Sequence, residues 1–507
     1  MFRASLSLTP YSGEDGAPKY GDFECHRTWM EVTYNLPISQ WYNDTPYSNS
    51  SYWPIDYPPL CAYTHLGMAS IISLFQPQAI QLGLSKGYDK GQYRALMGFF
   101  IMIFELLVFI PALEKVLDFY YSDKSKTTRN LYLLANLCIT PIFYIDHGHF
   151  QPNSVMHGLV LWAIYYMFQS KIEKAVIFMV LAVNFKQMAL YYGLPFGVYA
   201  LMLLYKDSTQ VSSNFLGRTG YIFGRVIILI AVFIGTFLVV YLPFFQASGL
   251  PGVQQILIRI FPVKRGLFEN NVASFWCVLH NFYKVKFIYD QPAQIKIAAV
   301  ATILGCIPSV IYLMRTPNNK QFLFALFNVS MSFFMFSFHV HEKQILLPLL
   351  IFGLLIHDFR HYFTFTVTVG NFSLAKLYLM DHNQISYFPM TFGFFYIGKM
   401  FDSFMINNFK VPAKEINILL YDDEFQIQND NKDQKQIWIS WLILRLRNTL
   451  CSLGVLFMIG FHICKTLFPP SEKLFDLYWA INNAFSFATF ALVLVYSHSL
   501  MHENKNN

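Results

Sequence analysis

The stretch "YIFGRVIILIAVFIGTFLVVYLPFF", residues 221–245, decides the fold class of this chain. It contains one charged residue, Arg225, and is otherwise mostly aliphatic and aromatic. A helix needs about 20 mostly apolar residues to cross a bilayer, because lipid offers no partners for exposed backbone groups. The stretch therefore predicts a transmembrane helix.

The composition of the whole chain is that of a membrane protein. Of its 507 residues, 55% are hydrophobic and 13% are charged, about half the usual charged share of soluble proteins. The net charge of +7 is modest and dispersed, which indicates loops facing anionic lipid and no nucleic-acid-binding surface. The seven cysteines include no Cys-x-x-Cys pair, so we expect neither a disulfide framework nor a zinc site.

Further apolar runs predict an all-α polytopic membrane protein with about 13 transmembrane helices. Clear candidates, besides the first stretch, are 95–113, 131–146, 153–169, 189–205, 295–314, 320–338, 344–357, 437–463 and 475–498. Weaker candidates are 174–185, 361–380 and 385–399.

Alternate connections between these spans differ in charge. One set is rich in basic residues, such as Lys124, Lys126 and Arg129, and is expected to face the cytosol by the positive-inside rule. The other set holds the polar clusters "YGDFE", "IDYPP", "IDHGHF" and "HVHEK" and is expected to face the lumen. The chain then divides into four regions. Residues 1–94 form a luminal loop region with the catalytic motif and interfacial helices, and residues 95–399 form a transmembrane bundle with luminal motif loops. Residues 400–436 form a cytosolic loop, and residues 437–507 form C-terminal transmembrane helices with a tail.

Asp22 lies in the luminal stretch "GDFECHRTWMEVTYN". In a helix over 22–34, Phe23, Arg27, Met30 and Tyr34 share one face. Asp22 is then either a helix N-cap, worth about 1 kcal/mol, or a general base at the membrane surface whose pKa is raised by burial among aromatics. These residues alone leave both interpretations open.

Asp56 lies in "WPIDYPPL", before two prolines that stiffen the chain. Taken alone, it is expected to cap a helix that begins near Pro58. The segment 58–76 that follows is too mixed for a confident span and is expected to form an interfacial helix.

Two His-x-His pairs occur, in "IDHGHF" and in "HVHEK". Residues two apart do not share a helix face, so a metal site is not expected at either pair. A hydrogen-bonded rim or a substrate contact is the alternative for His149, and His341 with Lys343 suits a phosphate at the membrane surface. Lys264 and Arg265 are either a solvated pair or face a lipid phosphate, and Lys186 is expected to extend toward the interface.

No Walker, G-x-G-x-x-G or G-x-S-x-G pattern is present, so we expect no nucleotide-binding site. An enzyme on the luminal side would need a sugar donor other than a cytosolic nucleotide sugar. A membrane-dissolved, phosphate-linked sugar suits this arrangement.

Six blocks of sequence carry a resemblance to a known family. They are "GDFECHRTWMEVTYNLPISQWY", "YWPIDYPPLCAY", "IDHGHFQPNSVM", "NFKQMALYY", "RIFPVKRGLFENNVASFWC" and "SFFMFSFHVHEKQILLPLL". In this order they resemble the endoplasmic-reticulum glucosyltransferases that use dolichyl phosphate glucose to build the N-glycan precursor. The wording "TWMEVTYNLP" and "VHEKQIL" is more similar to the member that adds the first glucose.

The resemblance implies a lipid-sugar glycosyltransferase (GT-C type) fold with about 14 spans in the endoplasmic-reticulum membrane and a luminal active site. Family members have a span before the "YSG" loop, at which this sequence begins. The implied reaction moves glucose from dolichyl phosphate glucose to the terminal mannose of lipid-linked Man9GlcNAc2, with inversion and an α-1,3 bond. The implied partners are these two lipids and the bilayer, without a metal or a cofactor.

The resemblance also implies residue functions. Asp22 matches the base of the family's acidic motif, Glu24 and Asp56 are expected near acceptor hydroxyls, and His149 is expected to contact substrate. The donor phosphate is expected at Arg265, His341 and Lys343.

Two alternatives stay open. The first is the sibling enzyme that adds the second glucose, which shares the acidic, DYPP-like and HGHF-like elements. The second is a transporter or lipid scramblase, whose ionisable residues typically lie within spans near the bilayer centre. Here such residues cluster at span ends, with Glu105 as the main exception.

Overall fold

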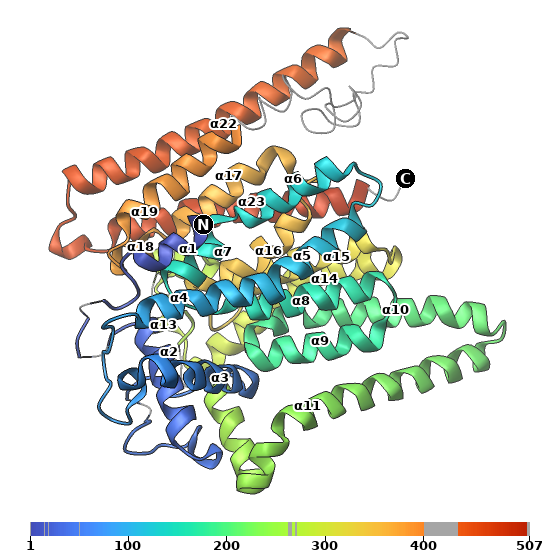
Figure 1. Ribbon diagram of the computed structural model, residues 1–507. Helices are drawn as coiled ribbons and strands as arrows, with labels where there is room; N and C mark the ends of the chain where they lie inside the picture. The colour runs from blue at the N-terminus through green and yellow to red at the C-terminus, as the bar shows by residue number, and fades with distance from the viewer. Residues whose placement is uncertain are drawn as a thin grey trace.

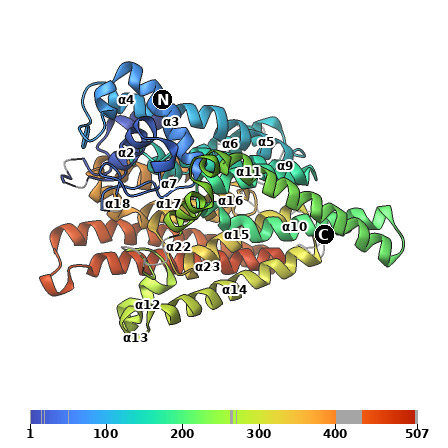
Figure 2. The same ribbon diagram turned by 90° about the horizontal axis from the view of Figure 1, so that it is seen from below.

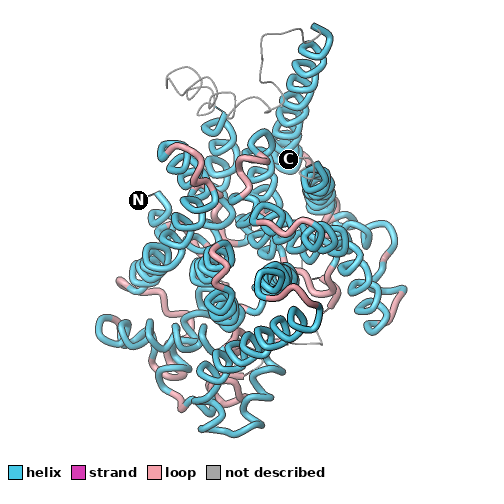
Figure 3. Tube along the Cα trace, turned by 90° about the vertical axis from the view of Figure 1, so that its right-hand side faces the viewer, coloured by secondary structure: helices cyan, strands magenta, loops and turns pink. Residues whose placement is uncertain are grey.

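The structure is a computed structural model that describes residues 2–14, 16–18, 20–49, 51–261, 266–268, 271–399 and 434–503. Throughout these ranges the regular structure is helical, and strand pairing is limited to two isolated bridges. Figure 3, in which the trace is coloured by secondary structure, shows helices joined by loops. The expected all-α class is therefore confirmed for this part of the chain. Arg265 and nearly all of the loop expected at 400–436 lie outside the described residues.

The N-terminal region consists of short helices and loops around one buried helix. Its main elements are α1 (Phe2–Ser5), α2 (Asp22–Asn35), α3 (Pro59–Phe75) and α4 (Tyr93–Phe104). The helices α2 and α3 pack against each other (Figure 1 and Figure 2). Every side chain of α2 from Phe23 to Thr33 is buried, so the helix expected at 22–34 is confirmed and lies inside the protein. The helix expected at 58–76 forms as α3, and its place at the membrane surface stays a prediction.

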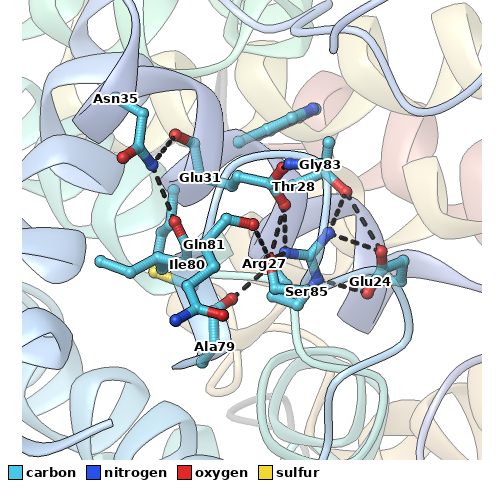
Figure 4. A network of polar contacts seen from close by, with 12 residues as sticks. Glu24, Arg27, Thr28, Glu31, Asn35, Ala79, Ile80, Gln81, Gly83 and Ser85 are labelled. Carbon is cyan, nitrogen blue, oxygen red and sulfur yellow. Dashed lines mark hydrogen bonds and ion pairs between the residues drawn. The ribbon is translucent and has the colours of Figure 1, made fainter. Parts of the chain in front are cut away.

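Charge pairing explains how a helix as polar as α2 is buried. The Arg27 guanidinium donates to both oxygens of Glu24, at 2.6 and 2.7 Å, and to Glu31 one turn further along (Figure 4). It also donates to the Ser85 hydroxyl at 2.5 Å and to the Ala79 carbonyl at 3.2 Å. Arg27 thereby joins α2 to the loop that precedes α4.

The centre of the protein is a bundle of apolar helices. Its members include α5 (Ile110–Tyr120), α8 (Asn153–Phe168), α9 (Ile172–Phe185), α15 (Asn319–Phe336) and α16 (Leu346–Leu354). All of α15 from Gln321 to Met335 is buried except Phe333, and α16 is buried along its whole length. Further helices complete this region: α6 (Lys126–Leu137), α7 (Thr140–Phe143), α12 (Phe275–Tyr283), α13 (Val285–Ile288), α17 (Arg360–Ser373), α18 (Ala375–Met380) and α19 (Gln384–Phe388).

Long helices with exposed apolar side chains surround the bundle. They are α10 (Gly193–Val211), α11 (Phe215–Ile260), α14 (Gln291–Arg315), α22 (Gln434–Leu467) and α23 (Leu477–Glu503). In Figure 1, α11 runs along the lower edge and α22 along the upper edge. The helix α11 bends at Gly249, where φ is 61°, a value that glycine adopts without the strain of a side chain.

Six helices in the described ranges are long and apolar enough to cross a bilayer. They cover 93–120, 187–211, 215–260, 291–315, 445–467 and 472–502. The protein is therefore a multi-pass membrane protein. Each of these helices matches an expected span, whereas the count of about 13 is not confirmed and stays a prediction.

Glu105, the acidic residue expected within a span, has partners. It begins the π-helical turn η4 (Glu105–Phe109) between α4 and α5. Its carboxylate pairs with Arg3 and lies 3.0 Å from Nε2 of His147. This pairing accounts for a carboxylate that is only 4% exposed, because a buried charge needs a counter-charge.

Replacing Arg27 with methionine tests the pairing in α2. The Arg27→Met variant leaves Glu24 and Glu31 buried without their shared cation, which costs about 3–5 kcal/mol. We expect a marked fall in the thermal unfolding midpoint of the detergent-solubilised protein. In the control Arg129→Met, the partner Asp118 is 42% exposed, so the loss is about 0–1 kcal/mol. Equal shifts in the two variants would contradict the function assigned to Arg27.

Candidate active site

A cavity of about 1040 Å³ opens beside the start of α2. Its walls come from α2, the loop before α3, the loop after the π-helical turn η5 (Tyr144–Gly148), and the 3₁₀ helices η6 (Gln187–Tyr192) and η7 (Glu342–Ile345). Five residues expected at the site line it: Asp22, Asp56, His149, His341 and Lys343. The fold thus brings together residues that are up to 321 positions apart in sequence.

Asp22 is held by three side chains from other elements. Its Oδ2 atom accepts hydrogen bonds from Lys343 Nζ at 2.6 Å, from His149 Nε2 at 2.9 Å and from the Gln151 amide. Gly21 is the N-cap of α2, and the Ser12 hydroxyl accepts a hydrogen bond of 3.0 Å from the Asp22 N–H at the start of the helix. The N-cap interpretation of Asp22 is therefore wrong, because its carboxylate points to this cluster.

The other oxygen of Asp22, Oδ1, accepts no hydrogen bond from the part of the chain that the structure describes. Within the described residues, every hydrogen bond to this carboxylate ends at Oδ2 and none at Oδ1. The side chain is 19% exposed and lines the cavity. Asp22 therefore keeps one acceptor atom for a group that enters the cavity.

His149 lies between two carboxylates. Its Nδ1 is 2.6 Å from Asp381 Oδ2, and its Nε2 faces Asp22. Asp381 also accepts a hydrogen bond from the Tyr144 hydroxyl at 2.8 Å. Burial acts to lower the pKa of His149, but Asp381 and Asp22 outweigh burial and raise the pKa to about 9. His149 is therefore an imidazolium that donates from both ring nitrogens.

The two cations set the charge state of Asp22. Burial acts to raise the pKa of Asp22, but Lys343 and then His149 outweigh burial and hold the pKa well below its ordinary value. The upward shift expected from burial is therefore wrong for this arrangement. Burial likewise acts to lower the pKa of Lys343, whereas Asp22 and Glu342 raise it above its ordinary value.

A third cation enters the cavity from the end of α9. Lys186 Nζ donates to Asn153 Oδ1 at 2.6 Å and to Gln151 Oε1 at 3.2 Å, and it lies over the Tyr57 ring. Lys186 is 3% exposed, so the expectation that it extends to the interface is wrong. Burial and, to a smaller extent, nearby Lys343 lower its pKa to about 8.

The remaining predicted residues differ in placement. Asp56 is on the cavity wall, while the N-cap of α3 is Pro58 with no side-chain cap, so the capping interpretation of Asp56 is wrong. His341 is 28% exposed, and its Nδ1 lies 2.9 Å from Glu342 Oε2. In the described part of the chain, Glu24 lies outside the cavity and is held by Arg27, as Figure 4 shows. The geometry therefore does not join Glu24 to Asp22.

Sequence reasoning missed two members of the cluster. Gln151 follows the motif "IDHGHF" directly, and its position beside that motif was an available signal. Asp381 follows the weak span expected at 361–380, and an isolated acid after an apolar run was the only signal there. The described residues contain no group of three or more histidine, cysteine or acidic side chains arranged to hold a metal ion.

The site is equipped for group transfer between hydroxyl and phosphate groups. It holds one carboxylate with an open oxygen, and cations beside it that suit an anionic leaving group.

The sequence matches the ALG6, ALG8 glycosyltransferase family over residues 1–496. The chain belongs to this family. Like its family, it is a glycosyltransferase.

Curated relatives are similar over most of their length. One is the "Dolichyl pyrophosphate Man9GlcNAc2 alpha-1,3-glucosyltransferase" of Gallus gallus, 32% identical over 511 residues, which cover 100% of this chain and 95% of that protein. The Saccharomyces cerevisiae protein of the same name is 30% identical over 98% of this chain and 89% of its own length. A Caenorhabditis elegans protein, with the same name prefixed "Probable", is 37% identical over 76% of this chain and 73% of its own length.

The charge state of His149 predicts a pH dependence of stability. Its pKa is about 9 in the folded protein against an ordinary 6.5, so the folded state keeps a proton that the unfolded chain loses. The resulting stabilisation is complete below about pH 6.5 and disappears as the pH rises through about 9. We expect the unfolding midpoint of the wild-type protein, relative to that of His149→Gln, to fall across this window, because Lys186, whose pKa is lowered to about 8, acts alike in both proteins.

The exposed His502 supplies a control for this measurement. The His502→Gln variant should follow the wild-type pH curve. Parallel curves for wild type and His149→Gln would contradict the assignment of an imidazolium between Asp22 and Asp381.

Proposed function

We propose that this protein transfers glucose from dolichyl phosphate glucose to the terminal mannose of lipid-linked Man9GlcNAc2, with inversion and an α-1,3 bond. In this proposal it lies in the endoplasmic-reticulum membrane with its active site facing the lumen, and it uses no metal or cofactor. Family membership and the names of its relatives support the proposal. The geometric observation that carries it is the Asp22 carboxylate, with Oδ2 held by cations and Oδ1 open to the cavity.

Asp22 is the general base of the proposed reaction. Inversion needs one base on the acceptor side of the sugar, opposite the leaving group. The base must also reach the attacking hydroxyl within hydrogen-bond distance. Oδ1 of Asp22 meets this need without breaking any hydrogen bond that Oδ2 makes.

The reaction conserves the total charge of the site. The mannose oxygen forms a bond to C1 of glucose while the bond from C1 to the phosphate oxygen breaks. Its electron pair leaves with dolichyl phosphate, whose charge becomes more negative by one, and the hydroxyl proton passes to Asp22. Negative charge therefore moves from Asp22 to the phosphate, where Lys343 and Lys186 stabilise it.

Donor binding adjusts the strength of the base. A carboxylate whose pKa is well below its ordinary value is a weak base, and Lys343 is the main cation that lowers the pKa of Asp22. A donor phosphate in the cavity competes for the Lys343 ammonium, because phosphate oxygens are strong acceptors for cations. As Lys343 turns to the phosphate, the pKa of Asp22 rises toward its ordinary value and the base becomes stronger. The site is then activated only when the donor is present.

The Asp22→Asn variant tests the base. An amide of the same shape cannot take the hydroxyl proton, so transfer should fall by at least about 10²–10⁴-fold. The measurement is glucose transfer by the purified protein in detergent, with membrane insertion checked separately. The control Asp118→Asn changes a carboxylate that is 42% exposed and should keep full activity. Near-normal turnover by Asp22→Asn would refute the assignment.

The same assay decides the acceptor. The purified protein is given the unglucosylated lipid-linked acceptor and, in parallel, the acceptor that already carries one glucose. Transfer to the first acceptor supports the proposal, and transfer to the second alone favours the sibling activity. Flux of lipid or solute without any sugar transfer would favour a transporter or scramblase.

The Lys343→Met variant tests the phosphate contact. Loss of a charge-assisted hydrogen bond costs about 1.5–3 kcal/mol, so the KM for dolichyl phosphate glucose should rise about 10- to 100-fold. The KM for the acceptor should change much less. The control Lys320→Met removes a lysine that is 37% exposed and pairs with Asp358, and it should leave both KM values unchanged. Equal losses for donor and acceptor would argue against a phosphate contact at Lys343.

A further inference from the structure

His26 belongs to a buried chain of hydrogen bonds that the proposed reaction does not use. It lies on α2, and its Nδ1 is 2.9 Å from Nε2 of His65 on α3. The other ring nitrogen of His65, Nδ1, is 2.8 Å from the Cys61 carbonyl oxygen. His26 and His65 are 3% and 0% exposed, so water does not compete for these contacts.

The Cys61 carbonyl fixes the tautomers of both rings. A carbonyl oxygen only accepts, so Nδ1 of His65 carries the hydrogen and its Nε2 is the acceptor in a neutral ring. Nδ1 of His26 must then be the donor to His65. The remaining nitrogen of His26, Nε2, is therefore an acceptor with a free lone pair.

The cavity is the place where His26 can use this acceptor. His26 lines the cavity wall, and within the described residues its Nε2 makes no hydrogen bond. Burial, together with nearby His65, keeps the pKa of His26 well below its ordinary value. The ring is therefore neutral, as the chain of hydrogen bonds requires.

The ring of His26 is held in place by aromatic neighbours. Its plane lies within 13° of the plane of His65, as their hydrogen bond requires, and its ring lies at 78° to the Trp29 ring. Trp29 is itself fixed by a hydrogen bond of 3.1 Å to the Pro54 carbonyl. A ring packed in this way presents Nε2 in one direction, which is a property of a binding group organised before its ligand arrives.

His26 lies one helical turn after Asp22 on the same face of α2. The Cβ atoms of residues four apart on a helix are about 5–6 Å apart. A pyranose ring carries hydroxyl groups on neighbouring carbons, so one sugar can donate one hydroxyl to Asp22 and the next to His26. The two acceptors would then hold the sugar at two adjacent positions.

We propose that His26 is a positioning residue, which accepts a hydrogen bond at Nε2 from a hydroxyl next to the attacking hydroxyl of the acceptor mannose. This inference rests on the proposed function, because it takes Asp22 as the base. The donor glucose is the less suitable partner, since its phosphate is expected at Lys343, which approaches Asp22 from η7. His26 instead adjoins Trp29, which lines the cavity together with Pro54 and Tyr57.

Deoxy acceptors test the contact directly. The purified full-length protein is given the parent lipid-linked acceptor and two analogues whose terminal mannose lacks the 2-hydroxyl or the 4-hydroxyl. A neutral hydrogen bond contributes about 0.5–1.5 kcal/mol, so the wild-type KM should rise about 2- to 12-fold for one of the two analogues. The donor KM should stay unchanged.

Variants of His26, measured with the same acceptor analogues, complete a double-mutant cycle between this side chain and the sugar hydroxyl. His26→Phe should raise the KM for the parent acceptor by the same factor and show no further loss with the sensitive analogue, because the contact is already absent. His26→Gln should recover part of the affinity, since its carbonyl oxygen can accept. His65→Phe frees the tautomer of His26 and should give a smaller rise that does not add to that of His26→Phe.

The outcomes separate this inference from the proposed function. A wild-type protein that transfers no glucose overturns the proposed function. A wild-type protein that transfers glucose, but uses both analogues with the KM of the parent acceptor, overturns the inference alone. If His26→Gln lowers kcat and raises both KM values by the same factor, His26 has a structural function, and this result would also overturn the inference. If His26→Phe does not fold, the wild-type analogue series and His26→Gln still decide.

Discussion

Two buried and two partly buried charges hold the site together. Asp22, His149, Lys343 and Asp381 come from four separate segments, and their formal charges cancel when His149 is protonated. Any one of them alone would cost several kcal/mol to bury, so each depends on the others. This requirement sets the start of α2, the loop after η5, η7 and the end of α18 at fixed positions, and the cavity is the space between them.

The same balance explains how such a cluster can serve a reaction. A neutral set of paired charges is stable while the cavity is empty, and an arriving phosphate adds negative charge near two lysines, Lys343 and Lys186. Proton transfer to Asp22 then compensates for the charge that grows on the leaving group. The ground-state pairing and the proposed chemistry thus use the same side chains, with Lys343 exchanged between carboxylate and phosphate.

The helix α2 both joins neighbouring segments and supplies side chains to the cavity, because its residues face different partners. Asp22 and His26 are four apart and lie toward the cavity, whereas Arg27 is turned to Glu24, Glu31 and the loop before α4. The helix is polar in composition and yet buried, since each charge meets a partner or the cavity. The sequence suggested Arg27 as part of an ordinary helix face and gave no sign of its contacts beyond α2, because the Ala79 carbonyl and the Ser85 hydroxyl lie 52 and 58 positions further along the chain.

The amino-acid sequence by itself determined the helical class and the membrane spans with long apolar runs, because hydropathy is a property of short segments, and its motifs predicted Asp22, His149 and Lys343 as site residues. Only the tertiary structure decided that Asp22 does not cap its helix, that its pKa falls instead of rising, and that Lys186 is buried. It also brought Gln151, Asp381 and the pair His26 and His65 into the site. The physical reason is that a charge state depends on neighbours across space, and these neighbours lie between 39 and 321 residues apart in the chain.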